Sequence, residues 1–202
     1  MGTAERRDRE KKQLRREILS AARELFAREG YENLSMRRIA QKIEYSPTTI
    51  YLYFKDKDEL IGEVCQETFV LLTKKLRKAF DADAAPLDRL KAGLKIYVDF
   101  ALKYPDHYRA TLMTPHWPED HKPAEADKSE GMRAFQCLID AVTACVAAGL
   151  FRESDVMLIS QFLWTSIHGM VSLWISMGEF PWVDKDQLLE FSVESSIRGL
   201  LK

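Results

Sequence analysis

The segment Ser35–Phe54 constrains the fold of this chain more than any other part of it. It contains two short stretches with helical patterns, and a serine stands directly before each of them, at Ser35 and Ser46. Serine is a preferred N-cap because its hydroxyl accepts a hydrogen bond from a free N–H of the first helical turn. Pro47 follows at the first helical position, where a missing N–H costs nothing. The segment therefore predicts two short helices joined by a tight turn.

The second of these helices carries side chains suited to contact with DNA. Thr48 and Thr49 stand near its start, where hydroxyls reach base edges and a threonine methyl meets a thymine methyl. Tyr51 and Tyr53 are placed to bond phosphates, which fixes the register on a duplex without reading its sequence. The segment is typical of a helix-turn-helix, which puts one helix into the major groove. The candidate DNA-binding residues are Ser35, Arg37, Ser46, Pro47, Thr48, Thr49, Tyr51, Tyr53, Lys55 and Lys57.

The charge distribution supports this interpretation, although the formal net charge of the whole chain is only -1. Residues 1–61 hold 14 Lys and Arg against 11 Asp and Glu, so positive charge gathers around the motif. A basic arm at the N-terminus either follows the DNA backbone or the minor groove, or is a frayed, solvated end. Its residues are Arg6, Arg7, Arg9, Lys11 and Lys12. For the candidate DNA-binding residues of the motif, the alternative is that they are ordinary surface groups of a small helical bundle.

Helical periodicity extends through the rest of the chain, and no alternating strand pattern interrupts it. A first helix is expected from about Arg9 to Glu29, with Gly30 as its stop, and Asp56 is expected to cap a long helix that ends near Phe80. The sequence therefore predicts an all-α fold of about nine helices. The remaining helices are expected at about 87–104, 106–113, 129–148, 154–177 and 185–201, with a proline-containing loop at 114–128.

Four groups of residues stand at defined offsets from one another between about residues 14 and 62: Ala22–Phe26, Gly30-Tyr31, Ile39-Ala40 and Thr49–Leu60. With these groups, the segment resembles the N-terminal domain of the tetracycline-repressor (TetR) family. The usual family turn, Ala-Gly-Val, is Ile43-Glu44-Tyr45 here, so the turn must tolerate a side chain in place of glycine. The resemblance implies a homodimeric, ligand-responsive regulator. It suggests a three-helix DNA-binding domain over residues 1–60 and a larger ligand-binding and dimerisation domain over 61–202.

A second, shorter resemblance lies near the C-terminus. Residues 162–173 are similar to the Trp-x-x-x-His-Gly pattern that a subset of TetR C-terminal domains carries. Within it, small side chains recur at helical spacing, which lets another helix approach closely. In this family the last two helices usually pair with their copies across a twofold axis, and close packing within one chain is the alternative. The candidate dimer-interface residues are Thr165, Gly169, Ser172 and Ser176.

Aromatic and flexible apolar residues of the C-terminal part are candidates for an effector cavity, because such composition suits a hydrophobic or aromatic small molecule. Trp164 and His168 lie one helical turn apart, and the imidazole could be the polar handle or a satisfied core group. Each of the others could equally be ordinary packing. The candidate ligand-binding residues are Phe100, Tyr104, Tyr108, Met113, Trp117, Phe135, Trp164 and His168. His107, His116 and His121 follow no zinc spacing, so neither a metal nor another cofactor is expected.

Several classes of protein are disfavoured. The sequence contains no Gly-rich phosphate loop and no nucleophile elbow, so it gives no indication of an enzyme. Three cysteines without a paired motif, and an N-terminus without an apolar signal core, favour the cytoplasm. The 23 uncharged residues 156–178 are long enough to span a bilayer, but nine are Ser, Thr, Gln, His or Gly, so we expect a helix buried on several sides and no membrane contact.

The sequence therefore predicts a transcription regulator that binds a near-palindromic double-stranded operator as a homodimer. We expect a repressor that an unidentified small-molecule effector releases from DNA. The alternatives are a DNA-binding regulator without a ligand, and a protein-interaction module that has lost specific DNA binding.

Overall fold

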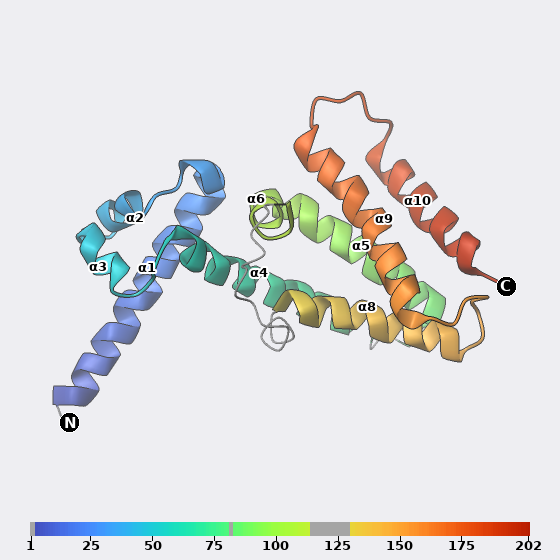
Figure 1. The fold of residues 1–202 in the computed structure, drawn as a ribbon, viewed down its shortest axis with the longest axis horizontal. Helices are drawn as coiled ribbons and strands as arrows, with labels where there is room; N and C mark the ends of the chain where they lie inside the picture. The colour runs from blue at the N-terminus through green and yellow to red at the C-terminus, as the bar shows by residue number, and fades with distance from the viewer. Residues whose placement is uncertain (1–2, 81–82, 114–129) are drawn as a thin grey trace. The chain divides into compact units, whose positions relative to one another are not determined.

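The computed structural model describes residues 3–80, 83–113 and 130–202, and these residues form nine α-helices without a β-strand, so the expected all-α fold is confirmed (Figure 1). A single π-helical turn, Arg109–Met113, interrupts the series. The predicted loop at 114–128 lies outside the described residues. The helices are α1 (Thr3–Asn33), α2 (Met36–Lys42), α3 (Pro47–Tyr51), α4 (Lys57–Phe80), α5 (Pro86–Lys103), α6 (Pro105–Tyr108), α8 (Glu130–Ala147), α9 (Val156–Ser176) and α10 (Lys185–Leu200).

The chain divides into two compact units, and each is described here by itself. The first unit contains α1 to α3, the beginning of α4 up to Glu67 and the π-helical residues from 110 onward. The second unit contains the rest of α4 and α5 to α10. Helix α4 passes without a break through residues 60 and 61. The domain boundary expected there stays a prediction.

The first helix is longer than its expected span of about Arg9 to Glu29. Helix α1 begins at Thr3, and side-chain pairs four residues apart, such as Arg6 with Glu10 and Asp8 with Lys12, support the added turns. Its path bends at Gly30, whose φ of 73° lies in the left-handed region. The expected stop is therefore a kink, and the chain regains helical conformation up to Asn33.

The first unit buries one continuous apolar cluster that holds α2 and α3 on α1. Ile18 and Phe26 of α1, Ile39 of α2 and Ile50 of α3 are fully buried. Ala40 is buried among them, and its small side chain suits the close crossing of two helices. The helical spacing of these residues brings them to one side of each helix. The exposed sides of α2 and α3 consequently carry polar residues.

In the second unit, α5, α8 and α9 pack on one another, and α10 packs on α9 and α5 (Figure 1). Helix α9 buries one row of side chains, which includes Leu163, Ile167, Val171 and Trp174. Its opposite side is exposed, so the expectation of a helix buried on several sides is wrong for the single chain. Helix α9 is also long and apolar enough to cross a membrane, but a core helix of a soluble protein passes the same test.

Candidate DNA-binding surface and effector site

Two serine caps position the helix pair of the first unit as the sequence predicts. The Ser35 hydroxyl accepts a hydrogen bond from the Arg38 N–H at 3.3 Å, and Ser46 does the same for the Thr49 N–H at 3.2 Å. Pro47 occupies the first position of α3. The Thr49 hydroxyl also lies 2.9 Å from that of Ser46. Each cap fixes where its helix begins, so the start of α3 is set locally.

The turn between α2 and α3 contains the residue that departs from the family pattern. Glu44 has a φ of 60°, in the left-handed region that glycine enters most easily. Its N–H donates to the Gln41 carbonyl at 3.3 Å, and the Tyr45 N–H donates to the Ala40 carbonyl at 2.9 Å. This pair of bonds is a Schellman motif, the common end of a helix. The turn therefore keeps the geometry expected of glycine while it carries a glutamate side chain.

Most of the predicted DNA-binding residues lie on the outer side of the helix pair. Ser46, Pro47, Thr48, Tyr51 and Lys55 are exposed, whereas Ser35, Thr49, Tyr53 and Lys57 are half-buried. Tyr51 exposes 54% of its surface, which is high for a large aromatic residue and leaves its hydroxyl available. These residues form one polar surface around α3.

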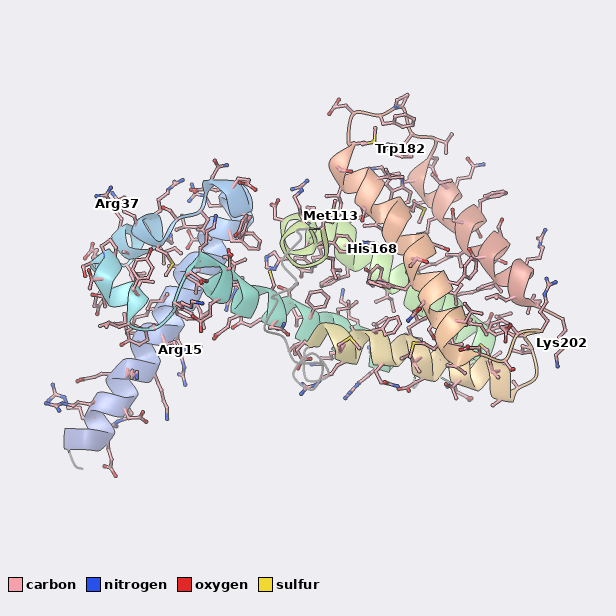
Figure 2. The ribbon with its side chains drawn as sticks, viewed as in Figure 1. Arg15, Arg37, Met113, His168, Trp182 and Lys202 are labelled. Atoms are coloured by element: carbon pink, nitrogen blue, oxygen red, sulfur yellow. The ribbon has the colours of Figure 1, made fainter. Side chains whose placement is uncertain are left out.

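Arg37 and Arg38 are adjacent in the sequence but differ in their surroundings. The Arg38 guanidinium donates to the Glu29 carboxylate of α1 at 2.8 Å, which commits it to the fold of the first unit. Arg37 is exposed at the outer edge of α2 (Figure 2). Arg37 is consequently the better placed of the two for an external partner.

Lys57 has a role that its sequence position does not reveal. Its ammonium group donates to the Tyr31 carbonyl at 3.1 Å and lies 3.8 Å from the centre of the Tyr31 ring. The Tyr31 hydroxyl in turn bonds Asp58 at the start of α4. Burial, together with Asp58, raises the pKa of that hydroxyl. Lys57 therefore joins the kinked end of α1 to α4, and a phosphate could share only its remaining N–H donors.

The N-terminal turns of α1 lie beside the helix pair. Arg7 and Lys11 line an open groove together with Tyr45, Leu52 and Tyr53. Leu52 exposes 75% of its surface there. The basic arm is a helical extension of α1, and it brings Arg7 and Lys11 next to Tyr45 and Tyr53.

In the second unit, a chain of hydrogen bonds joins α5, α6 and α9. The Tyr97 hydroxyl of α5 accepts from the Trp164 indole N–H at 3.1 Å and lies 3.1 Å from the Tyr108 hydroxyl. Tyr108 also bonds Nδ1 of His168, and Nε2 of His168 lies 3.4 Å from the Ser172 hydroxyl. Figure 2 marks His168 on α9, near its crossing with α5. The two residues that the sequence paired, Trp164 and His168, thus meet at Tyr97.

Tyr97 is a member of this cluster that the sequence analysis missed. It stands 67 residues from Trp164 and 71 from His168, so no local spacing connects them. Burial raises the pKa of the Tyr97 and Tyr108 hydroxyls, which remain protonated donors. Burial also lowers the pKa of the His168 imidazole from its usual 6.5, because a charged ring would lose its hydration. The cluster is therefore a neutral polar core in an aromatic setting.

Three of the other predicted ligand residues, Phe100, Tyr104 and Phe135, contact further aromatic rings or His107. Phe135 meets Trp164 edge-on, with ring centres 5.7 Å apart. Phe100 and Tyr104 lie 5.5 Å apart, and His107 continues that row while it bonds the Thr68 hydroxyl at 2.8 Å. Met113 is half-buried in the π-helical turn, and Trp117 falls outside the described residues. His116 and His121 do so as well, and no metal-binding group of three side chains occurs in the described ranges.

The stripe of small residues on α9 faces outward in the single chain. Thr165, Gly169 and Ser176 are exposed and Ser172 is half-buried. A Cβ atom built on Gly169 would meet no atom within 4 Å. Large apolar side chains on the same helix are exposed as well. Phe162 exposes 44% of its surface and Leu173 exposes 47%. On α10, Phe191 exposes 70%. The two final helices thus present apolar and small side chains outside the protomer.

Comparison with known families assigns both parts of the chain. Residues 18–64 match bacterial regulatory proteins of the tetR family, and residues 90–196 match a tetracyclin repressor-like C-terminal domain. The second match does not identify the subset with the Trp-x-x-x-His-Gly pattern, so that finer resemblance is not confirmed.

Individual relatives agree with this result. An uncharacterized HTH-type transcriptional regulator of Haemophilus influenzae is 42% identical over 71 residues, which cover 35% of this chain and 38% of that protein. The fatty acid metabolism regulator of Bacillus subtilis is 24% identical over 161 residues, or 79% of this chain and 82% of that protein.

Solved structures share the fold. A protein of unknown function from Rhodococcus sp. RHA1 superposes with a TM-score of 0.77 at 24% identity, covering 94% of this chain and 96% of its own. The regulator FadR of Bacillus subtilis, solved in complex with stearoyl-CoA, superposes with a TM-score of 0.68 at 21% identity, covering 91% and 98%.

Proposed function

This chain belongs to the TetR family of bacterial transcription regulators, and from that premise we propose that it is a ligand-responsive repressor that binds a near-palindromic operator as a homodimer. The observation that carries this proposal is the capped helix α3, whose outer side presents Thr48 and Tyr51 next to exposed cations. The protein acts in the cytoplasm, where its operator is. It needs no catalytic site for this function.

The contacts divide by chemistry. Thr48 and Thr49 read base edges, because their short side chains stand at the start of the helix that enters the groove. Tyr51, Tyr53 and Lys55 bond phosphates and fix the register, as does Arg37 at the start of α2. Arg7 and Lys11 add phosphate contacts from the N-terminal turns of α1. Lys57 contributes through the fold, since Tyr31 holds it.

A second copy of the chain covers the exposed side of α9 and α10. Small residues at Thr165, Gly169, Ser172 and Ser176 let the copies approach, and the flanking phenylalanines gain burial. A dimer places two recognition helices roughly 34–36 Å apart, one helical turn of DNA. Because a twofold axis relates the two copies, the operator is an inverted repeat.

The effector is a small hydrophobic or aromatic molecule that the second unit binds through the aromatic–histidine cluster. Tyr97, Tyr108, Trp164 and His168 offer hydroxyl, indole and imidazole groups that now bond one another. An effector that replaces one of these bonds changes the packing of α5 against α9. Because coupling is reciprocal, operator DNA must weaken effector binding by the factor with which effector weakens DNA binding.

Selection of bound duplexes from a random DNA pool, at two salt concentrations, tests the proposed function. Enrichment of an inverted repeat is the expected result. Salt-sensitive binding without enrichment would favour an interaction module that has lost specific recognition. Titration of an effector found by operator release, with and without the operator, tests the coupling. Equal affinities in the two titrations would exclude the allosteric mechanism and leave a regulator without a ligand.

A further inference from the structure

The second unit contains a pocket of about 450 Å³ that lies apart from the aromatic–histidine cluster. It opens between the end of α4, the start of α5 and one side of α8. None of the eight residues that the sequence suggested for ligand binding lines it. A volume of this size suits a small organic ligand. The lining residues are Arg77, Phe80, Pro86, Arg89, Arg133, Gln136, Cys137, Asp140, Ala141 and Ala144.

Three arginines converge on this pocket from three different helices. Arg77 comes from the last turn of α4, Arg89 from the first turns of α5 and Arg133 from α8. Asp140 is the one acidic residue among the lining side chains, and its carboxylate already accepts a hydrogen bond from Gln136 at 2.8 Å. The lining therefore carries an excess of positive charge, which favours an anion.

Each guanidinium keeps donors for a ligand. Arg89 uses one N–H to bond the Phe80 carbonyl at 2.8 Å, which ties the end of α4 to α5. Arg133 pairs with Glu130 one turn earlier on its own helix. A guanidinium has five N–H donors in a planar fork, which suits bidentate contact with a phosphate or carboxylate. The described contacts leave most of these donors available.

The remaining walls are apolar. Phe80, Pro86, Ala141 and Ala144 line the pocket beside the buried thiol of Cys137. Burial raises the pKa of that thiol, and Arg77 opposes the shift, so the Cys137 side chain is a neutral wall next to a cation. Apolar walls together with three arginines match a ligand with one apolar and one anionic end.

We propose that this pocket binds an amphipathic anion in which an apolar chain carries a phosphate or carboxylate headgroup, and that it is a second ligand site besides the aromatic–histidine cluster. The proposal does not depend on the proposed function, because binding of a ligand to this pocket requires no operator. The arginines hold the headgroup, and the chain extends along Phe80 and the alanines of α8. An acyl-CoA and a free fatty acid share this chemistry.

Binding to the full-length protein is tested by isothermal titration with lauroyl-CoA, laurate and free CoA. We expect lauroyl-CoA or laurate to bind, and the stronger of the two identifies the headgroup. Free CoA should bind at least tenfold more weakly than the stronger of the two acyl compounds, because it lacks the chain. Failure of both acyl compounds to bind, or binding of free CoA as tight as that of the stronger acyl compound, would overturn the proposal.

Variants locate the binding site. Arg77→Gln with Arg133→Gln should weaken the acyl ligand at least tenfold, whereas Arg152→Gln with Lys95→Gln, the same loss of two positive charges at exposed residues outside the pocket, should have no effect. Ala144→Leu should fill the pocket without any change of charge, and Ala147→Leu on the exposed part of the same helix is its control. Unaltered binding in the arginine and Ala144 variants, or loss only in His168→Gln, would place the ligand elsewhere and refute the proposal.

Operator binding by the same proteins is measured separately by electrophoretic mobility shift without ligand. Acyl-ligand binding without operator binding would contradict the proposed function and leave the pocket assignment intact. Operator binding without acyl-ligand binding would do the reverse. The two failures are therefore distinguishable.

Discussion

Glu44 and Gly149 end two different helices with the same pair of hydrogen bonds, yet only one of them is glycine. After α2 the pair is Glu44 N–H to Gln41 and Tyr45 N–H to Ala40, and after α8 it is Gly149 N–H to Val146 and Leu150 N–H to Cys145. Their φ angles are 60° and 68°. The helix-turn-helix therefore closes on a glutamate in a conformation that costs L-residues about 1–2 kcal/mol.

Glu44→Gly should raise the free energy of unfolding by about 0.5–1 kcal/mol, because relief of the left-handed strain exceeds the extra chain entropy of glycine. Chemical denaturation measures the change. Gly149→Ala is the matched variant and should destabilise the protein, since alanine would acquire the strain that Glu44 already bears. A loss of stability in Glu44→Gly would mean that the glutamate side chain compensates for its backbone.

Thr49→Ala should relax base choice at one operator position by about 1 kcal/mol, the lower end of a specific base contact. Thr49→Ser separates the two parts of the side chain, because it keeps the hydroxyl that lies near Ser46 and removes the methyl. If the methyl meets a thymine, the serine variant should relax the choice as well. Binding to operators altered one base pair at a time measures both effects.

Lys55→Ala should lower the slope of log affinity against log salt by about 1, the loss of one phosphate contact. Tyr51→Phe should weaken all sequences alike by about 1 kcal/mol and leave that slope unchanged, because a neutral hydroxyl releases no counterion. Fluorescence anisotropy at several salt concentrations checks both. An altered sequence preference in either variant would reassign that residue to base contact.

Gly169→Leu should weaken the dimer without unfolding the protomer. The Cβ position is open in the single chain, and leucine favours a helix over glycine by roughly 0.5–1 kcal/mol, so the protomer gains intrinsic helix stability. A leucine on this stripe would nevertheless keep two α9 helices apart. Gly62→Leu, at an equally open glycine of α4, is the control. Sedimentation should show monomer for the first variant only, and an intact dimer in both would place the interface elsewhere.

His168 should make stability depend on pH on the acidic side. Burial lowers its folded pKa below the usual 6.5, so the unfolded chain binds the proton more readily. The contribution of neutral His168 to the free energy of unfolding is therefore complete above about pH 6.5, and it is lost as the pH falls through the lower pKa of the folded state. Denaturation of the wild type and of His168→Gln at pH 5.5 and 7.5 gives the difference due to this residue. A variant with the same pH dependence as the wild type would show that His168 is not the group that titrates.

Local features of this molecule could be predicted from the sequence alone. The serine caps, Pro47 at the start of α3 and the helical spacing of Ile18 or Ile39 act within one turn of chain, so their outcome is written in neighbouring residues. The length of α1 was the local error, because pairs such as Arg6 with Glu10 stabilise turns that apolar periodicity does not reveal.

The tertiary structure decided which distant residues meet. Tyr97 reaches His168 across 71 residues, and Arg77, Arg89 and Arg133 reach one pocket from three helices. It also decided that Lys57 bonds Tyr31 and that Arg38 pairs with Glu29. Periodicity states which side of a helix is buried but not which side of another helix it meets. Contacts between helices depend on the crossing of whole elements, so they follow from the packed chain and not from any segment of it.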